Sequence, residues 1–194
     1  NMADHHWDGI TRQLTKFGRI YKEYERGYDQ FHQSESYIYF YFLCMADPEN
    51  SKLIDRARRF AGFYLNEDPE AQNYDSVHRI IRAPHNGSGG PAWGMSDDDS
   101  EMSYNPGPGM VAYGLPLSDV PGITKVEDLK DPVKARAMGK AMAERLREGD
   151  VGNNLNVNGL IMNAYLMTGE DKYRDWLLEY VGAWLKRTGD NNGL

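Results

Sequence analysis

The sequence lacks the features that mark several common protein classes. Among 194 residues there is a single cysteine, Cys44, so no disulfide framework and no cysteine-based metal site is expected. No apolar run approaches the roughly 18 residues that cross a bilayer, and residues 1–30 lack a signal-peptide pattern. We therefore expect no membrane partner, and we interpret Cys44 as a small buried hydrophobic residue.

Basic blocks and nucleotide-binding motifs are also missing. The formal net charge is −7, and no cluster of Lys and Arg offsets it, so no nucleic-acid partner is expected. The glycine-rich loops of nucleotide-binding folds, the GxSxG motif of esterases and the HExxH motif of zinc proteases are absent. The histidines His5, His6 and His32 lack the helical spacing of a zinc site, so we predict neither a metal nor a cofactor.

Helical periodicity is present, and the helices come in pairs. Residues 34–46 form an aromatic, almost uncharged run, which predicts a helix buried on every side with Ser34 as its N-cap. A polar turn at residues 47–50 follows. The next segment has one apolar stripe and a charged back, so we expect an outer helix that covers the first; its stripe consists of Leu53, Ala57, Phe60, Ala61 and Tyr64.

The same pair recurs near the C-terminus. Residues 156–167 are apolar, and after a short turn an amphipathic segment follows. When the first pair is displaced by 120 positions, Lys52, Asp55, Gly62 and Leu65 coincide with Lys172, Asp175, Gly182 and Leu185. Two helical hairpins with the same order of elements indicate an internal repeat.

Two further helices complete the prediction of one all-α domain over residues 1–194. We expect an amphipathic helix from the N-cap Asp8 to about Tyr24, and another that begins at Asp131-Pro132. This gives six helices and no strand. Between the hairpins, residues 66–131 are rich in Gly, Pro, Asn and Asp, and a loop of this length in a compact domain is usually functional.

The hairpins and the junction Tyr-Leu-Met-Thr-Gly-Glu-Asp-Lys-Tyr over 165–173 resemble the (α/α)6 toroids of the six-hairpin glycosidase-like superfamily. The resemblance covers about residues 8–65 and 132–188. It implies a carbohydrate-active enzyme, either a glycoside hydrolase or a polysaccharide lyase. A complete toroid needs about twice as many helices as this sequence supplies, so we expect either a fragment or an open arc that needs a partner. The oligomeric state is left open.

Hairpin geometry predicts where a site lies. The amino end of an inner helix and the carboxyl end of its outer helix share one face. The segment before Ser34, the loop after Leu65 and the turn at 149–154 should therefore converge there. Helix amino ends favour anionic or hydroxyl-rich ligands, because their N–H groups are free and carry partial positive charge.

Hydrolysis of a glycosidic bond usually requires two carboxyl groups. Glu35 is the candidate general acid, since partial burial at the start of an aromatic helix would raise its pKa; alternatively it is a first-turn capping residue. Asp8 is its candidate partner, or only the N-cap described above. Asp75 and the acidic run 97–101 are further options; the run is either a Ca²⁺ ligand set or a solvated loop.

Elimination from a uronate requires a base and a group that neutralises the carboxylate. Tyr74 and His78 are candidate bases. For each of these side chains the alternative is a loop hydrogen bond or a surface charge. The residues predicted to bind substrate are His32, Arg79, Arg82, His85, Asn86, Trp93 and Asn154.

These observations favour an enzyme that hydrolyses glycosidic bonds, with uronate-containing glycans as substrate and an oligosaccharide or polysaccharide as its partner. One alternative is a polysaccharide lyase acting by beta-elimination. A second is a helical repeat that binds a protein or glycan without catalysis. We expect an extracellular or periplasmic location, with a cytoplasmic one left open.

Overall fold

The computed structural model describes residues 2–91 and 120–193, and the chain is mostly helical there, as predicted. The described part contains six α-helices and two 3-10 helices, η3 (Val126–Lys130) and η4 (Gly152–Asn156). The α-helices are α1 (Met2–Lys16), α2 (Gln30–Ala46), α3 (Ser51–Gly62), α5 (Pro132–Arg147), α6 (Val157–Thr168) and α7 (Asp171–Asp190). No helix among these residues combines the length and apolar character needed to cross a membrane.

The prediction of no strands is wrong, because six two-residue strands form three antiparallel pairs. β1 pairs with β2, β3 with β6 and β4 with β5. The last three strands and η3 lie in the described parts of the long loop predicted over residues 66–131. The strands are β1 (Ile20–Tyr21), β2 (Tyr24–Glu25), β3 (Tyr28–Asp29), β4 (Tyr74–Asp75), β5 (Ile80–Ile81) and β6 (His85–Asn86).

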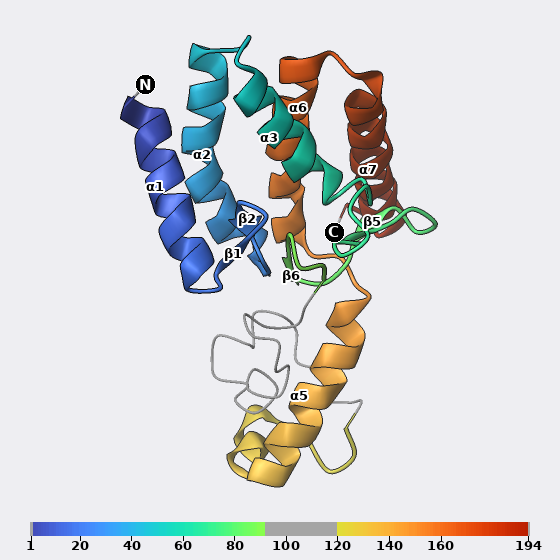
Figure 1. The fold of residues 1–194 in the computed structure, drawn as a ribbon. Helices are drawn as coiled ribbons and strands as arrows, with labels where there is room; N and C mark the ends of the chain where they lie inside the picture. Colours follow the sequence, from blue (N-terminus) through green and yellow to red (C-terminus); the bar gives the residue numbers. More distant parts are fainter. Residues whose placement is uncertain (1, 92–119, 194) are drawn as a thin grey trace.

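The two predicted hairpins are present as α2–α3 and α6–α7, and they stand next to each other (Figure 1). The inner helices α2 and α6 contact one another, while α3 packs against both of them. Helix α1 runs opposite to α2 on the side away from α6, and α5 extends away from the other helices (Figure 1). Within the described residues the two hairpins are therefore direct neighbours, and α1 flanks the first of them (Figure 1).

Two helix starts differ from the prediction. Helix α1 begins at Met2, so Asp8 lies in its middle rather than at its N-cap, and it ends at Lys16 before Gly18, whose φ of 72° suits glycine. Helix α2 begins at Gln30, because the Asp29 side chain accepts a hydrogen bond from the His32 backbone N–H at 3.2 Å. Ser34 instead donates to the Phe31 carbonyl at 2.8 Å from within the helix.

The core is built from aromatic rings. Tyr24 stacks on Tyr37 with ring centroids 4.6 Å apart, and Phe60, Phe63 and Tyr64 surround it. Tyr24 arrives from β2, Tyr37 from α2 and the other three from α3 or the residues after it. Offset and edge-on ring pairs of this kind add about 0.5–1.5 kcal/mol each beyond the area they bury.

Helix α2 is not buried on every side, contrary to the prediction. Its buried residues include Tyr37 and Phe40, which contact α1 and α3, and Cys44, which contacts α6. The opposite side of the same helix is apolar but exposed; it carries Phe31, Ile38, Tyr39, Phe42 and Met45. The apolar composition was therefore read correctly, but the described chain supplies neighbours for only part of the helix surface.

Candidate functional site

The three segments expected to converge do meet, at the amino ends of the two inner helices. β3 precedes α2 and pairs with β6, so that Asp29 lies opposite His85. On the other side of β6, Asn86 Nδ2 donates to Asn154 Oδ1 at 2.9 Å, which joins the long loop to the turn before α6. The sequence-based prediction of convergence is confirmed.

Asn86 and Asn154 hold this junction together from inside the protein. Both side chains are fully buried. Asn86 Oδ1 accepts from Gln30 Nε2 at 2.7 Å and from the Tyr64 hydroxyl at 3.1 Å. Asn154 Nδ2 donates to the carbonyl of Ala83 at 3.1 Å. We call these side chains of Gln30, Tyr64, Asn86 and Asn154 the amide cluster; it positions the loops and is closed to solvent, which differs from the predicted contact of Asn86 and Asn154 with substrate.

Beside the amide cluster, the accessible chemistry centres on Asp29 and His32. His32 Nδ1 lies 2.7 Å from Asp29 Oδ2, while the other Asp29 oxygen caps α2. Asp29 is buried and the His32 side chain is 55% exposed. The buried carboxylate therefore orients the imidazole, while the rest of the ring is open to solvent. The hydrogen bond that His32 donates to Asp29, together with the negative charge of Asp29, raises the pKa of His32 above its ordinary value. The arrangement is a base held by a carboxylate.

Aromatic groups flank this pair. The Tyr28 ring contacts two imidazoles: its centroid lies 5.3 Å from that of His32 and 5.9 Å from that of His85. Phe31 meets His32 edge-on at 5.7 Å and is exposed. Exposed or half-buried rings next to a base are the kind of surface on which a sugar ring stacks.

Glu35 is exposed on α2, three residues after His32, and its charge contributes to the raised pKa of His32. Positions three apart in a helix lie on one face, so the two side chains are neighbours. The partial burial expected for Glu35 is absent. Glu35 therefore has the position, but not the desolvated surroundings, of the predicted general acid.

Asp8 is engaged elsewhere. Its carboxylate accepts from Lys52 Nζ at 2.6 Å and from Arg56 Nη2 at 2.5 Å, and these groups, Lys52 first, lower the pKa of Asp8 despite its partial burial. Glu23 also bonds Arg56, with 3.2 Å between Oε2 and Nε. A carboxylate held by two cations keeps its negative charge and is a poor proton donor. Asp8 thus ties α1 to α3.

The remaining candidates lie in two parts of the structure, one beside α7 and the other beside the start of α2. Tyr74 is buried and donates to Glu179 Oε1 at 2.8 Å, and burial followed by that carboxylate raises its pKa. His78 lies on the exposed β4–β5 turn with Nδ1 2.7 Å from Asp75 Oδ2. Arg187 of α7 donates to the backbone carbonyls of His78 and Arg79. These groups therefore border α7, whereas His85 and Asn86 border α2.

Arg82 lies between the group beside α7 and the group beside α2. Its Nε is 3.7 Å from Glu148 Oε2, and its carbonyl lies 3.5 Å from Asn86 Nδ2. Arg79 is exposed. Trp93 and the acidic run 97–101 lie outside the described residues. Within residues 2–91 and 120–193, no group of three or more His, Cys, Asp or Glu side chains could hold a metal ion.

Sequence reasoning missed Asp29 and Asp150. Asp29 directly precedes a helical run, which is an N-cap signal, but Ser34 carried a similar signal five residues later. Asp150 accepts from the Ile81 N–H at 3.1 Å and from Trp184 Nε1 at 3.2 Å, so it joins β5 to α7. Its partners are remote in sequence, and no local pattern indicates them.

Comparison with known proteins identifies the family. The family model described as domain of unknown function DUF8034 matches residues 1–194, and the chain belongs to that family. No curated protein and no solved structure matches the chain.

Proposed function

We propose that this chain carries the proton-transfer group of a carbohydrate-active enzyme, and that the group is His32 oriented by Asp29. The observation that carries the proposal is the 2.7 Å contact between a buried carboxylate and an exposed imidazole at the amino end of an inner helix. The resemblance of the hairpins to six-hairpin carbohydrate-active proteins supplies the substrate class, and it is an analogy of fold.

Beta-elimination from a uronate is the reaction that these groups support best. Neutral His32 takes the proton from C5 of the uronate, the electron pair forms the C4–C5 double bond, and the C4–O bond to the leaving sugar breaks. The leaving oxygen takes its proton from Tyr28 or from water. We assign the uronate carboxylate to Arg82, whose backbone carbonyl contacts Asn86 of the amide cluster. A single positioned base of this type contributes about 10²–10⁴-fold to rate.

Hydrolysis, the reaction favoured by the sequence, is the second candidate. Its support is the placement of Glu35 three residues from His32 on one exposed face of α2. Asp8 is no longer a suitable partner, because Lys52 and Arg56 hold its carboxylate. Hydrolysis therefore requires His32 or its Asp29 partner to activate the water.

Mass spectrometry of the products separates these reactions. The protein is incubated with uronate-containing and neutral oligosaccharides. Elimination gives fragments whose summed mass equals that of the substrate, one of them with an unsaturated uronate, whereas hydrolysis adds one water. No product from a folded sample would overturn the catalytic proposal and favour the binding alternative.

The chain offers a matched control for the base. Asp75 and His78 reproduce the Asp29–His32 geometry, with the same spacing and the same 2.7 Å contact, but lie on the exposed β4–β5 turn. His32→Gln should lower kcat by at least about 10²-fold, and His78→Gln should leave it within a factor of about two. The reverse result would move the base to His78, the candidate predicted from sequence.

A further inference from the structure

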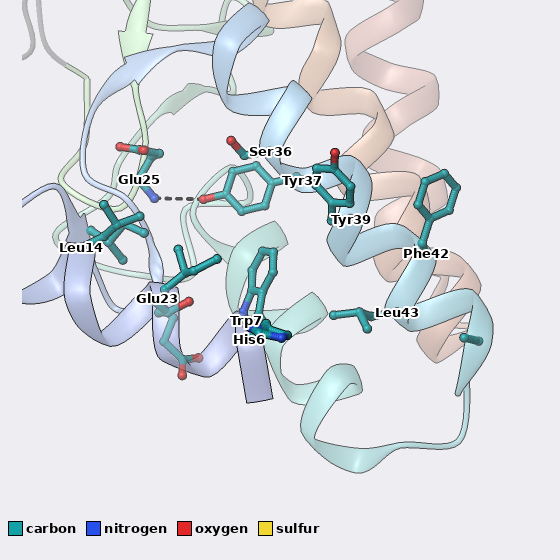
Figure 2. Close-up of a pocket in the computed structure, with 14 residues that line it drawn as sticks. His6, Trp7, Leu14, Glu23, Glu25, Ser36, Tyr37, Tyr39, Phe42 and Leu43 are labelled. Atoms are coloured by element: carbon teal, nitrogen blue, oxygen red, sulfur yellow. Dashed lines mark hydrogen bonds between the residues drawn. The ribbon is translucent and has the colours of Figure 1, made fainter. Parts of the chain in front are cut away.

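A large apolar groove lies between α1 and α2. It encloses about 700 Å³, which is within the range of about 300–1,000 Å³ that is usual for small-molecule sites. Trp7 and Leu14 line it from α1, and Tyr37, Tyr39 and Phe42 line it from α2 (Figure 2). The volume and the lining are those of a pocket for an apolar small molecule.

The chain itself closes this groove at one end. The connection from α1 to α2 runs through the β1–β2 hairpin, and Ile20 and Glu25 of this hairpin line the groove. Figure 2 shows Glu25 near Leu14 at this end, with Phe42 and Leu43 at the opposite end. A ligand in the groove therefore has one end against the hairpin, and its length lies along α2.

Charge in the groove is concentrated at the closed end. The described lining residues include two carboxylates, Glu23 and Glu25, and no Lys or Arg. Glu23 already pairs with Arg56 and Arg59 of α3. The half-buried Glu25 carboxylate makes no hydrogen bond or ion pair within the described chain, and the charge of Arg19 acts on it only from a distance. Glu25 is therefore the carboxylate that remains for a ligand.

The chemistry of this end selects a cation. A carboxylate that is partly removed from water regains favourable interactions when it pairs with a positive group, and the resulting charge-assisted hydrogen bond is strong in apolar surroundings. Tyr37 lies beside it, because its hydroxyl accepts from the Glu25 backbone N–H at 3.1 Å. The faces of aromatic rings also attract cations. An anionic ligand would instead be repelled by both glutamates.

We propose that the groove between α1 and α2 binds a small organic amine, whose protonated amino group pairs with the Glu25 carboxylate and whose apolar body lies along α2 toward Ala46. The groove follows α2 from Ser36 to Ala46, which is about 15 Å at the helical rise per residue. A docked polypeptide helix fits less well. Such a helix is about 10–12 Å wide with its side chains and continues as chain beyond both ends, whereas the hairpin closes one end here.

Isothermal titration calorimetry with three matched probes tests the proposal on the full chain. Decylamine, decanol and decanoate share one apolar body and differ in the charge of the head group, and each is used below the concentration at which it aggregates. The expected result is one decylamine per chain, bound with a Kd at least about tenfold lower than that of decanol. Decanoate should bind more weakly than decanol.

Two pairs of variants locate the site. Glu25→Gln should weaken decylamine binding at least about tenfold and leave decanol binding within a factor of about two, whereas Glu49→Gln, an exposed carboxylate on the turn between α2 and α3, should change neither. Phe42→Ala should weaken both ligands alike, and Leu178→Ala on α7 should weaken neither. Phe42 and Leu178 are both exposed, so these two substitutions leave the core intact.

Four results would overturn the proposal. Equal affinities for decylamine and decanol, or tighter binding of decanoate, would mean that Glu25 does not select the ligand. An unchanged preference for decylamine in Glu25→Gln would place the amine elsewhere. Binding of several decylamine molecules per chain that Phe42→Ala leaves unaltered would be non-specific adsorption. No binding of any of the three probes to the folded protein would mean that the groove is not a ligand site.

Discussion

Replacing Asn86 by alanine should unfold the junction that positions the candidate site. The Asn86 side chain is fully buried and makes five hydrogen bonds, the longest of them 3.5 Å from Nδ2 to the Arg82 carbonyl. Its Oδ1 accepts from Gln30 and Tyr64, and its Nδ2 donates to the Ala83 carbonyl and to Asn154. These partners come from four separate segments, so one truncation weakens every contact between them.

The size of the effect follows from what each partner keeps. Gln30 Nε2 and the Tyr64 hydroxyl still bond each other at 2.6 Å, and the Ala83 carbonyl still accepts from Asn154 Nδ2 at 3.1 Å. Asn154 Oδ1, in contrast, loses its donor and stays buried. Lost hydrogen bonds between neutral groups cost about 0.5–1.5 kcal/mol each, and an unsatisfied buried group costs about 1–3 kcal/mol. Because the other partners keep a hydrogen bond, the expected loss is the cost of the unsatisfied Asn154 Oδ1 plus that of about one hydrogen bond, or about 2–4 kcal/mol.

Urea unfolding followed by circular dichroism measures this loss. At a denaturant dependence of about 2 kcal/mol/M, the midpoint should fall by about 1–2 M with an unchanged slope. The matched control is Asn156→Ala, whose exposed amide donates only to the Asn153 carbonyl at 3.0 Å. It should change stability by less than about 0.5 kcal/mol. If Asn86→Ala unfolds like this control and instead loses glycan binding, the amide faces a ligand and our structural reading is refuted.

Three other substitutions test contacts elsewhere in the structure. In NMR titrations, Asp29→Asn should lower the His32 pKa toward its ordinary value of 6.5. The wild-type pair stabilises the fold fully below that pH and loses this stabilisation as pH rises through the raised pKa, so a pH-independent difference between the two proteins would contradict the contact. Arg56→Ala should cost about 1.5–3 kcal/mol in thermal or urea unfolding, because it removes the buried partner that Asp8 and Glu23 share, although both carboxylates are partly exposed and keep Lys52 and Arg59; a loss below about 1 kcal/mol would contradict this. Gly87→Ala should destabilise by at least about 1–3 kcal/mol, since its Cβ would meet a backbone oxygen of β2. Gly182→Ala, in open space on α7, should stabilise by about 0.5–1 kcal/mol, and equal effects at the two glycines would refute the packing.

The helices could be predicted from the sequence because their periodicity extends over three or more turns. Helix ends were harder, since Asp29 and Ser34 offer the same N-cap chemistry to one helix and only the β3–β6 pairing decides between them. The two-residue strands are shorter than any recognisable alternation, and β3 and β6 in addition lie far apart in sequence. Tyr24 was assigned to a helix for this reason, although it lies in β2.

Sequence reasoning located the site better than it assigned the residues. The order of inner and outer helices suffices to bring the three loop segments together, whichever residues they carry. Whether an amide there is buried, as in Asn86, or a carboxylate is neutralised, as in Asp8, depends on partners such as Arg56 that arrive from elsewhere in the chain. The prediction that α2 is buried on every side was wrong for the same reason, because composition shows that a surface is apolar but not which neighbour covers it.

The two Asp–His pairs show why geometry alone does not define a catalytic base. In each pair the aspartate caps a local turn and orients an imidazole three residues later, so Asp75 with His78 is as well formed as Asp29 with His32. The surroundings differ: His32 stands beside Tyr28 at the amino end of an inner helix, while His78 is 71% exposed on a turn. A substrate that stacks on the ring and presents a proton to the imidazole can meet both requirements only at His32. The variants His32→Gln and His78→Gln both lose the hydrogen bond between an aspartate and an imidazole, but only the first should lose turnover. Comparing them therefore tests the surroundings of the Asp–His pair and not the pair itself.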